Sequence, residues 1–337
     1  MVRDRGRPGG KDAAVSFLLR RSALVLLSAA CLQAASAAAQ SFPARPLRVI
    51  VPFAPGGATD VVFRLLAPKL SENLGQQVIV DNRAGGGSTI GMDAVAKSAP
   101  DGYTLGVANL SFAVNPSLLA KLPYDTERDF APVSLVTIVP LAISVHPAIP
   151  ARSVKDLIAL AKAKPGSLTY ASSGNGSATH MATEMFKYLT GTDIVHVPYS
   201  GGGPAVVSVV GGQVSIYTGS IPSQLQHIKS GKLVALAVTS AKPDPSLPGI
   251  PTVGETVPGY EAVEWQGFVV PSGTADPVIE RLNRAIVESV KAPDFNERLA
   301  GVGAHAVGST PGEFAEYLKK ELATWSKVIK ATGIRIE

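Results

Sequence analysis

Two glycine-rich turns carry the residues best suited to bind a small anion. The first spans Phe53–Asp60, between an apolar, β-branched run that predicts a buried strand and a segment that predicts a helix. Thr59 and Asp60 suit the N-cap or first turn of that helix. A strand that passes through such a turn into a helix brings free backbone N–H groups and the positive end of a helix dipole to one point, which favours an anion. An ordinary turn without a ligand is the alternative.

The kind of anion follows partly from patterns that are missing. Neither the phosphate-binding pattern G-x-x-x-x-G-K-[ST] nor the dinucleotide pattern G-x-G-x-x-G occurs in the sequence. The glycines of Gly85–Gly87 have the wrong spacing for a dinucleotide, and we interpret them as a turn that caps the next helix. A small carboxylate fits the same geometry as a phosphate, and the sequence is compatible with that ligand.

A second turn repeats the arrangement of the first. It spans Ser172–His180 and lies between a predicted strand, Leu168–Ala171, and a predicted helix, Met181–Leu189. Two such turns, one in each lobe of a two-lobed protein, can hold one anion from both sides, so the pair is a stronger indication than either turn alone. Asn109 follows a further predicted strand, at the edge where open α/β sheets bind ligands. For His180, at the start of the helix, a capping or structural role competes with ligand contact.

The sequence carries no recognisable catalytic or metal-binding pattern. A G-x-S-x-G nucleophile turn is absent, and Gly174–Ser177 has the wrong register for one. The five histidines are scattered, without an H-E-x-x-H pattern or a Cys/His cluster, so no zinc site is predicted. His196 lies in an apolar run and is interpreted as a buried histidine with a hydrogen-bond partner. We therefore predict no catalytic residue, no metal and no cofactor; a secreted enzyme of unrecognised type is the alternative.

Residues 1–39 have the composition of a secretory signal peptide. Basic residues precede an apolar run, Ser22–Ala35, which is too short to span a bilayer, and small residues continue through Ala39. We predict cleavage after Ala37 or Ala39 and export of the mature chain without insertion into the membrane. A membrane anchor, a lipoprotein signal at Cys31 and twin-arginine export are the less favoured alternatives.

Removal of this segment changes what the charge implies. The whole chain has 31 basic and 26 acidic residues, of which six and two lie within 1–39. The mature chain is therefore close to neutral, and no basic surface for nucleic acid is predicted. Cys31 is the only cysteine and is removed with the signal, so the mature chain offers no thiol chemistry.

Strand and helix patterns alternate along the chain, which favours an α/β fold. Without the signal the chain is still too long for a usual single core, so we expect two lobes. Phe130–Val145 is an unusually long apolar stretch that Pro140 interrupts; it predicts either two strands or one strand that crosses between the lobes. Val263–Val270 is interpreted as a return crossing strand.

The chain resembles a known family of receptors along nearly its whole mature length. That family, the Bug family, comprises the solute-binding receptors of tripartite tricarboxylate transporters. The matching segments occur in family order: Pro46–Gly57, Val80–Arg83, Ala99–Leu105, Ser173–His180, His196–Tyr199 and Gly211–Val214. The resemblance implies a two-lobed periplasmic binding protein of type II, in which each lobe is a mixed sheet flanked by helices and the ligand lies in a cleft between the lobes. With the crossing stretches, we expect lobe 1 over 40–142 and 264–337 and lobe 2 over 143–263.

The resemblance also implies the partners and the ligand contacts. The two facing turns would hold a small carboxylate through backbone N–H groups and ordered waters. The loaded receptor, a monomer in the periplasm, would then dock on membrane permease subunits. A receptor for a signalling partner is the alternative. Carried onto this sequence, the implied ligand-binding residues are Phe53, Ala54, Gly57, Ala58, Thr59, Asn109, Ser173, Gly174, Asn175, Gly176, Ser177, His180 and Tyr199.

The sequence departs from the family at one place that bears on the ligand. Family members often carry an acidic residue followed by Asn after the strand that here ends at Tyr217–Thr218, whereas this chain has Gly219–Ser220. The missing carboxylate argues against an amino acid or another cationic ligand. We therefore predict a mono-, di- or aromatic carboxylate.

Overall fold

The computed structural model describes residues 42–53, 55, 58–301 and 303–334. The predicted signal peptide lies outside these residues, and so do Ala54, Gly56 and Gly57 of the first turn. The chain divides into two compact units, Met1–Ala44 and Arg45–Glu337. Only Phe42–Ala44 of the first unit are described, and the helices and strands all lie in the second.

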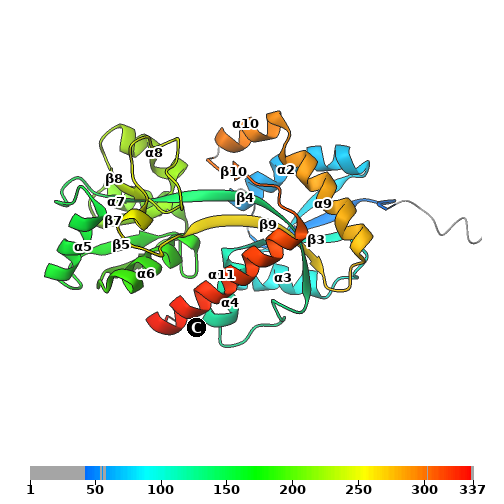
Figure 1. Cartoon of the computed structure of the whole chain (residues 1–337), viewed down its shortest axis with the longest axis horizontal. Helices are drawn as coiled ribbons and strands as arrows, with labels where there is room; N and C mark the ends of the chain where they lie inside the picture. Colours follow the sequence, from blue (N-terminus) through cyan, green and yellow to red (C-terminus); the bar gives the residue numbers. More distant parts are fainter. Residues whose placement is uncertain (1–41, 54, 56–57, 302, 335–337) are drawn as a thin grey trace, which may run out of the picture. The chain divides into compact units, whose positions relative to one another are not determined.

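Ten strands within the described residues form one mixed sheet (Figure 1). Eight of them follow the order β2-β1-β3-β9-β4-β7-β5-β6, and β8 and β10 pair with β4 outside that path. The strands are β1 (Leu47–Val51), β2 (Val78–Asn82), β3 (Thr104–Asn109), β4 (Phe130–Val145), β5 (Thr169–Ser172), β6 (Val195–Pro198), β7 (Ile216–Ser220), β8 (Val234–Val238), β9 (Val263–Pro271) and β10 (His305–Ala306).

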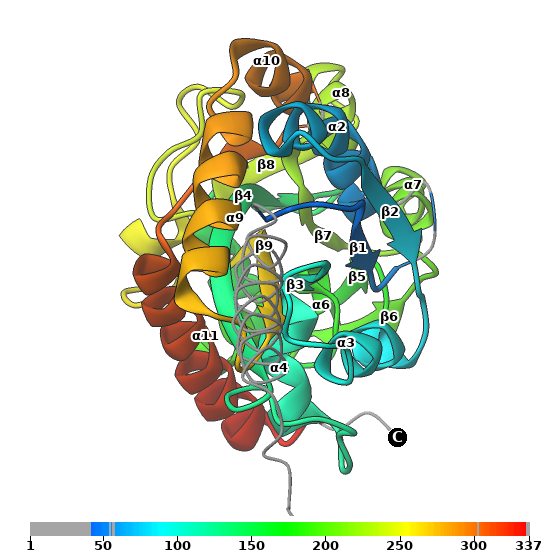
Figure 2. The ribbon, with the colours of Figure 1, turned by 90° about the vertical axis from the view of Figure 1, so that its right-hand side faces the viewer.

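Helices connect the strands and cover the sheet. They are α2 (Ala58–Leu74), α3 (Thr89–Ala96), α4 (Leu110–Leu118), α5 (Val154–Ala163), α6 (Ala178–Thr190), α7 (Gly202–Val210), α8 (Ile221–Lys229), α9 (Asp276–Val290), α10 (Pro293–Gly301) and α11 (Pro311–Thr332), with short 3-10 helices at Gly86–Ser88 and Val253–Glu255. In Figure 2, α2 and α9 lie on one side of β1–β3, and α3 and α4 lie on the other. Helix α9 buries Leu282, Ala285, Ile286 and Ser289, the three- and four-residue spacing of an amphipathic helix.

The sheet contains two groups of parallel strands joined by two long strands. β1 pairs in parallel with β2 and β3, and β5 pairs in parallel with β6 and β7. The first part of β4 pairs with β9, and its second part pairs with β7 and β8. We call the first parallel group with its helices lobe 1 and the second group with its helices lobe 2. The two-lobed α/β fold is therefore as predicted.

The long apolar stretch forms one continuous strand, β4, of 16 residues. The crossing-strand interpretation is confirmed, and the two-strand alternative is wrong. Pro140 is the last partner of β9, opposite Val263, and the strand changes partners directly after it. The N–H of Leu141 then donates to the hydroxyl of Thr239 at 3.1 Å. Because proline has no N–H to donate, it fits where the sheet changes partners.

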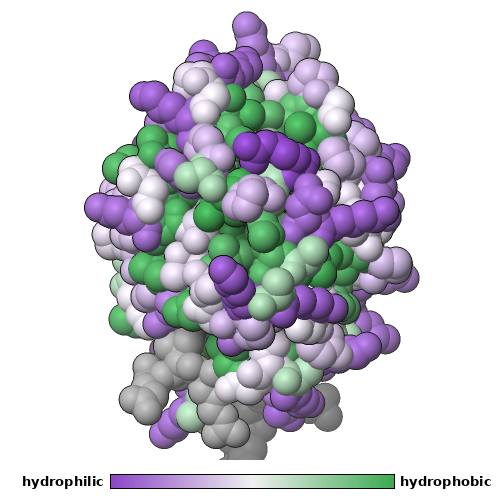
Figure 3. Space-filling view, turned by 90° about the vertical axis from the view of Figure 1, so that its left-hand side faces the viewer, coloured by the Kyte–Doolittle hydropathy of each residue, from purple (hydrophilic) through white to green (hydrophobic). Residues whose placement is uncertain are grey.

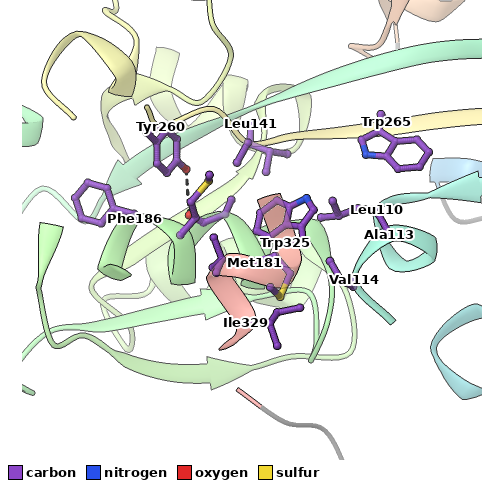
Figure 4. Packing of buried hydrophobic residues seen from close by; sticks show 14 of the residues in the cluster. Leu110, Ala113, Val114, Leu141, Met181, Phe186, Tyr260, Trp265, Trp325 and Ile329 are labelled. Carbon is purple, nitrogen blue, oxygen red and sulfur yellow. Dashed lines mark hydrogen bonds between the residues drawn. The ribbon is translucent and has the colours of Figure 1, made fainter. Parts of the chain in front are cut away.

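Helix α11 packs against both lobes, on α4 of lobe 1 and on α6 of lobe 2. Figure 4 shows Trp325 of α11 between Leu110 of α4 and Met181 of α6. Trp265 of β9 is fully buried in the same hydrophobic cluster. The hydrophobic core therefore continues from one lobe into the other.

No helix in the described part of the chain is both long enough and apolar enough to cross a bilayer. On the face shown in Figure 3, at the end of lobe 2, hydrophobic and hydrophilic residues are interspersed.

Candidate ligand-binding site

The carboxyl ends of both parallel groups meet the same short section of β4. Asn109, the last residue of β3, pairs with Gln266 of β9, which pairs in turn with Thr137 of β4. From lobe 2, Ser220, the last residue of β7, pairs with Leu141 of β4. Thr137 and Leu141 are four residues apart on one strand, a distance of roughly 13 Å. The turns that follow both groups therefore lie close to Thr137–Leu141, which we call the interlobe section, at the edges where open α/β sheets bind ligands.

A buried carboxylate connects the two ends of the first turn. Asp60 accepts from Nε of Arg64 at 2.9 Å and from Nδ2 of Asn82 at 2.8 Å. Nδ2 of Asn82 also donates to the carbonyl of Phe53 at 3.0 Å, and Nη2 of Arg64 donates to Oδ1 of Asn82 at 2.7 Å. The partly buried Phe53 at the start of the turn is thus tied to the first turn of α2 at its end.

Thr59 connects the start of α2 to the crossing strand β9. Its side chain is buried, and its Oγ1 accepts from Nε2 of Gln266 at 3.3 Å. Oε1 of Gln266 accepts from Oγ1 of Thr137 at 3.3 Å, so Gln266 joins α2 to the interlobe section. Asn109 is buried beside Gln266, and its Oδ1 caps α4 by accepting from the N–H of Ser111 at 3.1 Å. The amide NH2 group of Asn109 is therefore the part of its side chain that suits a ligand.

Three hydroxyl groups of the second turn lie together. Oγ of Ser173 lies 2.9 Å, and Oγ of Ser177 lies 3.0 Å, from Oγ1 of Thr179. Ser177 is the N-cap of α6: its hydroxyl accepts from the N–H of His180 at 3.3 Å and donates to the carbonyl of Gly174 at 2.6 Å. Gly174 has a φ of 124°, a backbone conformation that favours glycine. Hydroxyl groups and a helix N-terminus thus meet here, an arrangement that can donate several hydrogen bonds to one anion.

The remaining predicted residues differ in exposure. Asn175 is exposed in the second turn, and Gly176 is buried next to it. Tyr199 is partly buried, and its N–H donates to the carbonyl of Ser172, the last residue of β5, at 3.0 Å. Ala58 is the first residue of α2.

His180 supports the second turn from within lobe 2. Its Nδ1 accepts from the N–H of Gly176 at 3.1 Å, and it is only 5% exposed. Burial lowers the pKa of His180 to about 3, so the imidazole is neutral. Its ring stacks on that of His196 with 4.2 Å between centroids, and Nε2 of His196 lies 2.6 Å from Oγ of Ser172. His196 is partly buried and not fully buried, and it has the hydrogen-bond partner that the sequence led us to expect. A ligand contact of His180 stays a prediction.

A buried network lies behind the two histidines. The ring of Tyr170 in β5 stacks on His196 with 4.7 Å between centroids. The Tyr170 hydroxyl donates to Oε1 of Glu184 at 2.6 Å, and Nζ of Lys187 lies 2.6 Å from the same oxygen. Burial, and then the Glu184 charge, raise the pKa of Tyr170. The start of α6 is therefore anchored to β5 and β6 by polar groups as well as by packing.

Sequence reasoning missed the contribution of β9. Glu264 and Gln266 are polar residues two positions apart in a predicted strand, and residues with that spacing point to one face. This alternation, in a strand expected to cross between the lobes, was the available signal. Asn82 and Thr179 were also missed. The partner of Asn82, Phe53, is 29 positions away in the sequence, and Thr179 meets Ser173 only because the chain turns between them.

Comparisons with known proteins agree with one another. Residues 62–334 match the family model described as tripartite tricarboxylate transporter family receptor. The chain is 42% identical to protein BugT of Bordetella pertussis over 307 residues. The matched region covers 90% of this chain and 94% of that protein.

Solved structures give the same result. R. palustris Rpa4515 with adipate is 35% identical with a TM-score of 0.76, covering 88% of this chain and 100% of that one. MatC (Rpa3494) from Rhodopseudomonas palustris with bound malate is 32% identical with a TM-score of 0.73, covering 86% and 100%. The periplasmic binding protein BugD is 33% identical with a TM-score of 0.73, covering 88% and 100%.

Proposed function

We propose a function from the family to which the chain belongs, the tripartite tricarboxylate transporter receptors. The protein captures a small carboxylate between its two lobes and delivers it to the membrane permease of such a transporter. The observation that carries this proposal is the meeting of both sets of strand ends at the interlobe section. The protein binds its ligand and does not turn it over. Mono-, di- and aromatic carboxylates make up the proposed ligand class, and the relatives described with adipate and malate support it.

The proposed contacts come from both turns. The N-termini of α2 and α6 direct backbone N–H groups at the carboxylate, and the hydroxyls of Thr59 and Ser173 add donors. The Ser177 hydroxyl adds a third by exchanging its hydrogen bond to the Gly174 carbonyl for one to the ligand. Hydrogen bonds to an ionised carboxylate are stronger than neutral ones, and exclusion of water strengthens them further. The other proposed ligand-binding residues are Phe53, Ala54, Gly57, Ala58, Asn109, Gly174, Asn175, Gly176, His180 and Tyr199.

We also propose where the lobes divide. Lobe 1 would comprise 40–142 and 264–337, and lobe 2 would comprise 143–263, so that both boundaries lie within or next to the paired strands β4 and β9. A ligand that contacts both lobes favours the closed arrangement, because it interacts with more groups there than in an open one.

The proposed location and partners complete the function. Residues 1–39 would direct export, and the mature chain would work as a monomer in the periplasm. The likeness to BugD, described as a periplasmic binding protein, supports this location.

A thermal-shift screen of the purified mature chain against a carboxylate library tests the proposal. A ligand at 100 times its dissociation constant should stabilise the protein by roughly 2.7 kcal/mol. Because a receptor can be purified with its native ligand, the screen is repeated after unfolding and refolding. If no carboxylate raises the melting temperature of the refolded protein, the proposed function is wrong.

A further inference from the structure

Glu264 of β9 lies opposite the middle of the interlobe section. It pairs with Val139 of β4, halfway between Thr137, which marks the ends of the lobe 1 strands, and Leu141, which marks the end of β7. Of all residues on β9, it is therefore the one opposite the centre of the proposed binding site.

The neighbours of Glu264 along β9 establish the direction of its side chain. The indole of Trp265 is fully buried and donates to Glu321 of α11 at 2.8 Å. Adjacent side chains of a strand point to opposite faces, so Glu264 and Gln266 both point away from α11. On that face Gln266 reaches Thr59 at the start of α2. The Glu264 side chain is thus on the same face of β9 as Thr59.

From lobe 2, Tyr217 of β7 lies within electrostatic range of Glu264. Burial raises the pKa of Tyr217, and the Glu264 charge adds to that effect while a hydrogen bond with Ser223 opposes it. The Tyr217 hydroxyl donates to the carbonyl of Gly202 at 3.4 Å, at the first residue of α7. Glu264 therefore shares its face of β9 with the Gln266 side chain that reaches Thr59 of lobe 1, and it interacts electrostatically with Tyr217 of lobe 2.

In the described part of the chain, the Glu264 carboxylate has no cationic partner. No ion pair within residues 42–53, 55, 58–301 and 303–334 includes Glu264, although the side chain is partly buried. Burial raises the pKa of Glu264, against a smaller opposing effect of the Gln266 amide. Carboxylates in such surroundings are usually paired, because removal from water disfavours an isolated charge. An anion-binding site with an unpaired carboxylate at its centre repels a second carboxylate and attracts a cation.

We propose that Glu264 determines specificity: it receives an ammonium or other cationic group of the ligand, whose carboxylate is held by the two glycine-rich turns. Glu264 thus supplies, from β9, the negative charge that the sequence lacks after Tyr217–Thr218. The inference rests on the proposed function and revises its ligand class. A carboxylate with a positive group at the other end, which the residues after Tyr217–Thr218 argued against, becomes the favoured ligand because Glu264 provides the negative charge from another strand. A dicarboxylate of the same length is disfavoured.

Matched ligand pairs test this assignment. Titration calorimetry compares amino acids that carry a terminal ammonium group with dicarboxylates of equal length, such as 6-aminohexanoate with adipate, over a series of lengths. The proteins are the refolded mature chain, Glu264→Gln and Glu261→Gln. Glu261 is exposed, and its one ion pair among the described residues is with Lys320 at 3.4 Å, so its variant makes the same chemical change outside the site. Glu264→Asp, which retains the charge, accompanies Glu264→Gln, and circular dichroism verifies that each variant is folded.

The expected result is a reversal of preference. The native chain and Glu261→Gln should bind the amino acid of the best length at least about tenfold more tightly than its dicarboxylate. Glu264→Gln should lose that preference and bind the dicarboxylate more tightly than the native chain does, and Glu264→Asp should keep part of the preference.

Two outcomes would overturn the inference and leave the proposed function intact. In one, carboxylates bind but Glu264→Gln has the same selectivity as the native chain. In the other, the native chain prefers dicarboxylates, as expected if a protonated Glu264 donates a hydrogen bond to the ligand. Binding of neither class to any of the proteins would instead overturn the proposed function itself.

Discussion

The imidazole rings of His180 and His196 stack with 4.2 Å between centroids and 12° between their planes. Nδ1 of His180 is occupied by the N–H of Gly176, and the ring is buried, so a proton on His180 would disturb the base of the second turn. The pair therefore links the protonation of a side chain to the shape of a candidate ligand contact.

Acid should destabilise the folded chain partly through His180. Its pKa is lowered by burial from 6.5 to about 3, so the unfolded chain takes up the proton first as the pH falls. This contribution to stability is fully present above pH 6.5 and is lost progressively as the pH approaches 3. We expect the melting temperature of His180→Gln to depend less on pH across this window than that of the native chain. His227→Gln, in α8, is the matched control, and equal slopes for the native chain and His180→Gln would contradict the assignment.

Thr59→Ala should weaken ligand binding and lower stability. The substitution removes the acceptor for Nε2 of Gln266, which leaves a buried amide donor without that partner and costs about 1 kcal/mol. Titration calorimetry and urea unfolding measure the two effects. If the variant binds ligand as tightly as the native chain, the Thr59 hydroxyl does not contact the ligand. The backbone contacts of the first turn are not affected by this substitution and need a separate test.

Ser177→Ala should also weaken binding, because it removes a hydroxyl and the N-cap of α6 together. Loss of the cap alone costs about 1 kcal/mol of stability. Ser153→Ala provides a matched control, since Ser153 caps α5 in the same way by accepting from the N–H of Asp156 at 3.1 Å. Both variants should lose similar stability, but only Ser177→Ala should lose affinity; equal affinity losses would attribute the effect to capping and not to ligand contact.

Tryptophan fluorescence should report ligand binding directly. The chain has two tryptophans, and the indoles of Trp265 and Trp325 donate to the same oxygen, Oε2 of Glu321, at 2.8 Å and 3.0 Å. Because these residues lie where β9 and α11 pass between the lobes, a movement of the lobes should change their emission. In Trp325→Phe, Trp265 is the one remaining tryptophan, so the emission reports on β9 by itself. An unchanged spectrum at a ligand concentration that raises the melting temperature would show that binding does not move this region.

The elements that local pattern determines were predictable from the sequence. Ser153 caps α5, Pro222 lies in the first turn of α8 and Pro293 begins α10, and each of these is a signal that the local sequence carries by itself. α4 begins directly after β3 with the Asn109 cap, yet no element was predicted over most of its length, since Pro116 within it suggests a break. β10 has two residues and exists through its pairing with β4, which no local pattern reveals.

The site divides in the same way. The two turns were recognisable because glycine, serine and helix starts occur next to one another in the sequence. The partners that hold the turns were not recognisable, because Asn82 and Gln266 act across 29 and 207 positions of the chain. The position of Glu264 in the site depends on strand register. Its pairing with Val139 places it opposite the centre of the interlobe section, which its neighbours in the sequence do not indicate.

The sheet runs without interruption from one lobe to the other, and β4 and β9 stay hydrogen-bonded up to the point where the partners of β4 change. The lobes are thus joined by a continuous sheet and not by flexible linkers. A ligand that draws the lobes together has to bend this sheet near Thr137–Leu141. The bent sheet exerts an elastic restoring force that favours the open arrangement. The receptor would then carry its own means of reopening, and ligand release would need only the loss of contacts to one lobe.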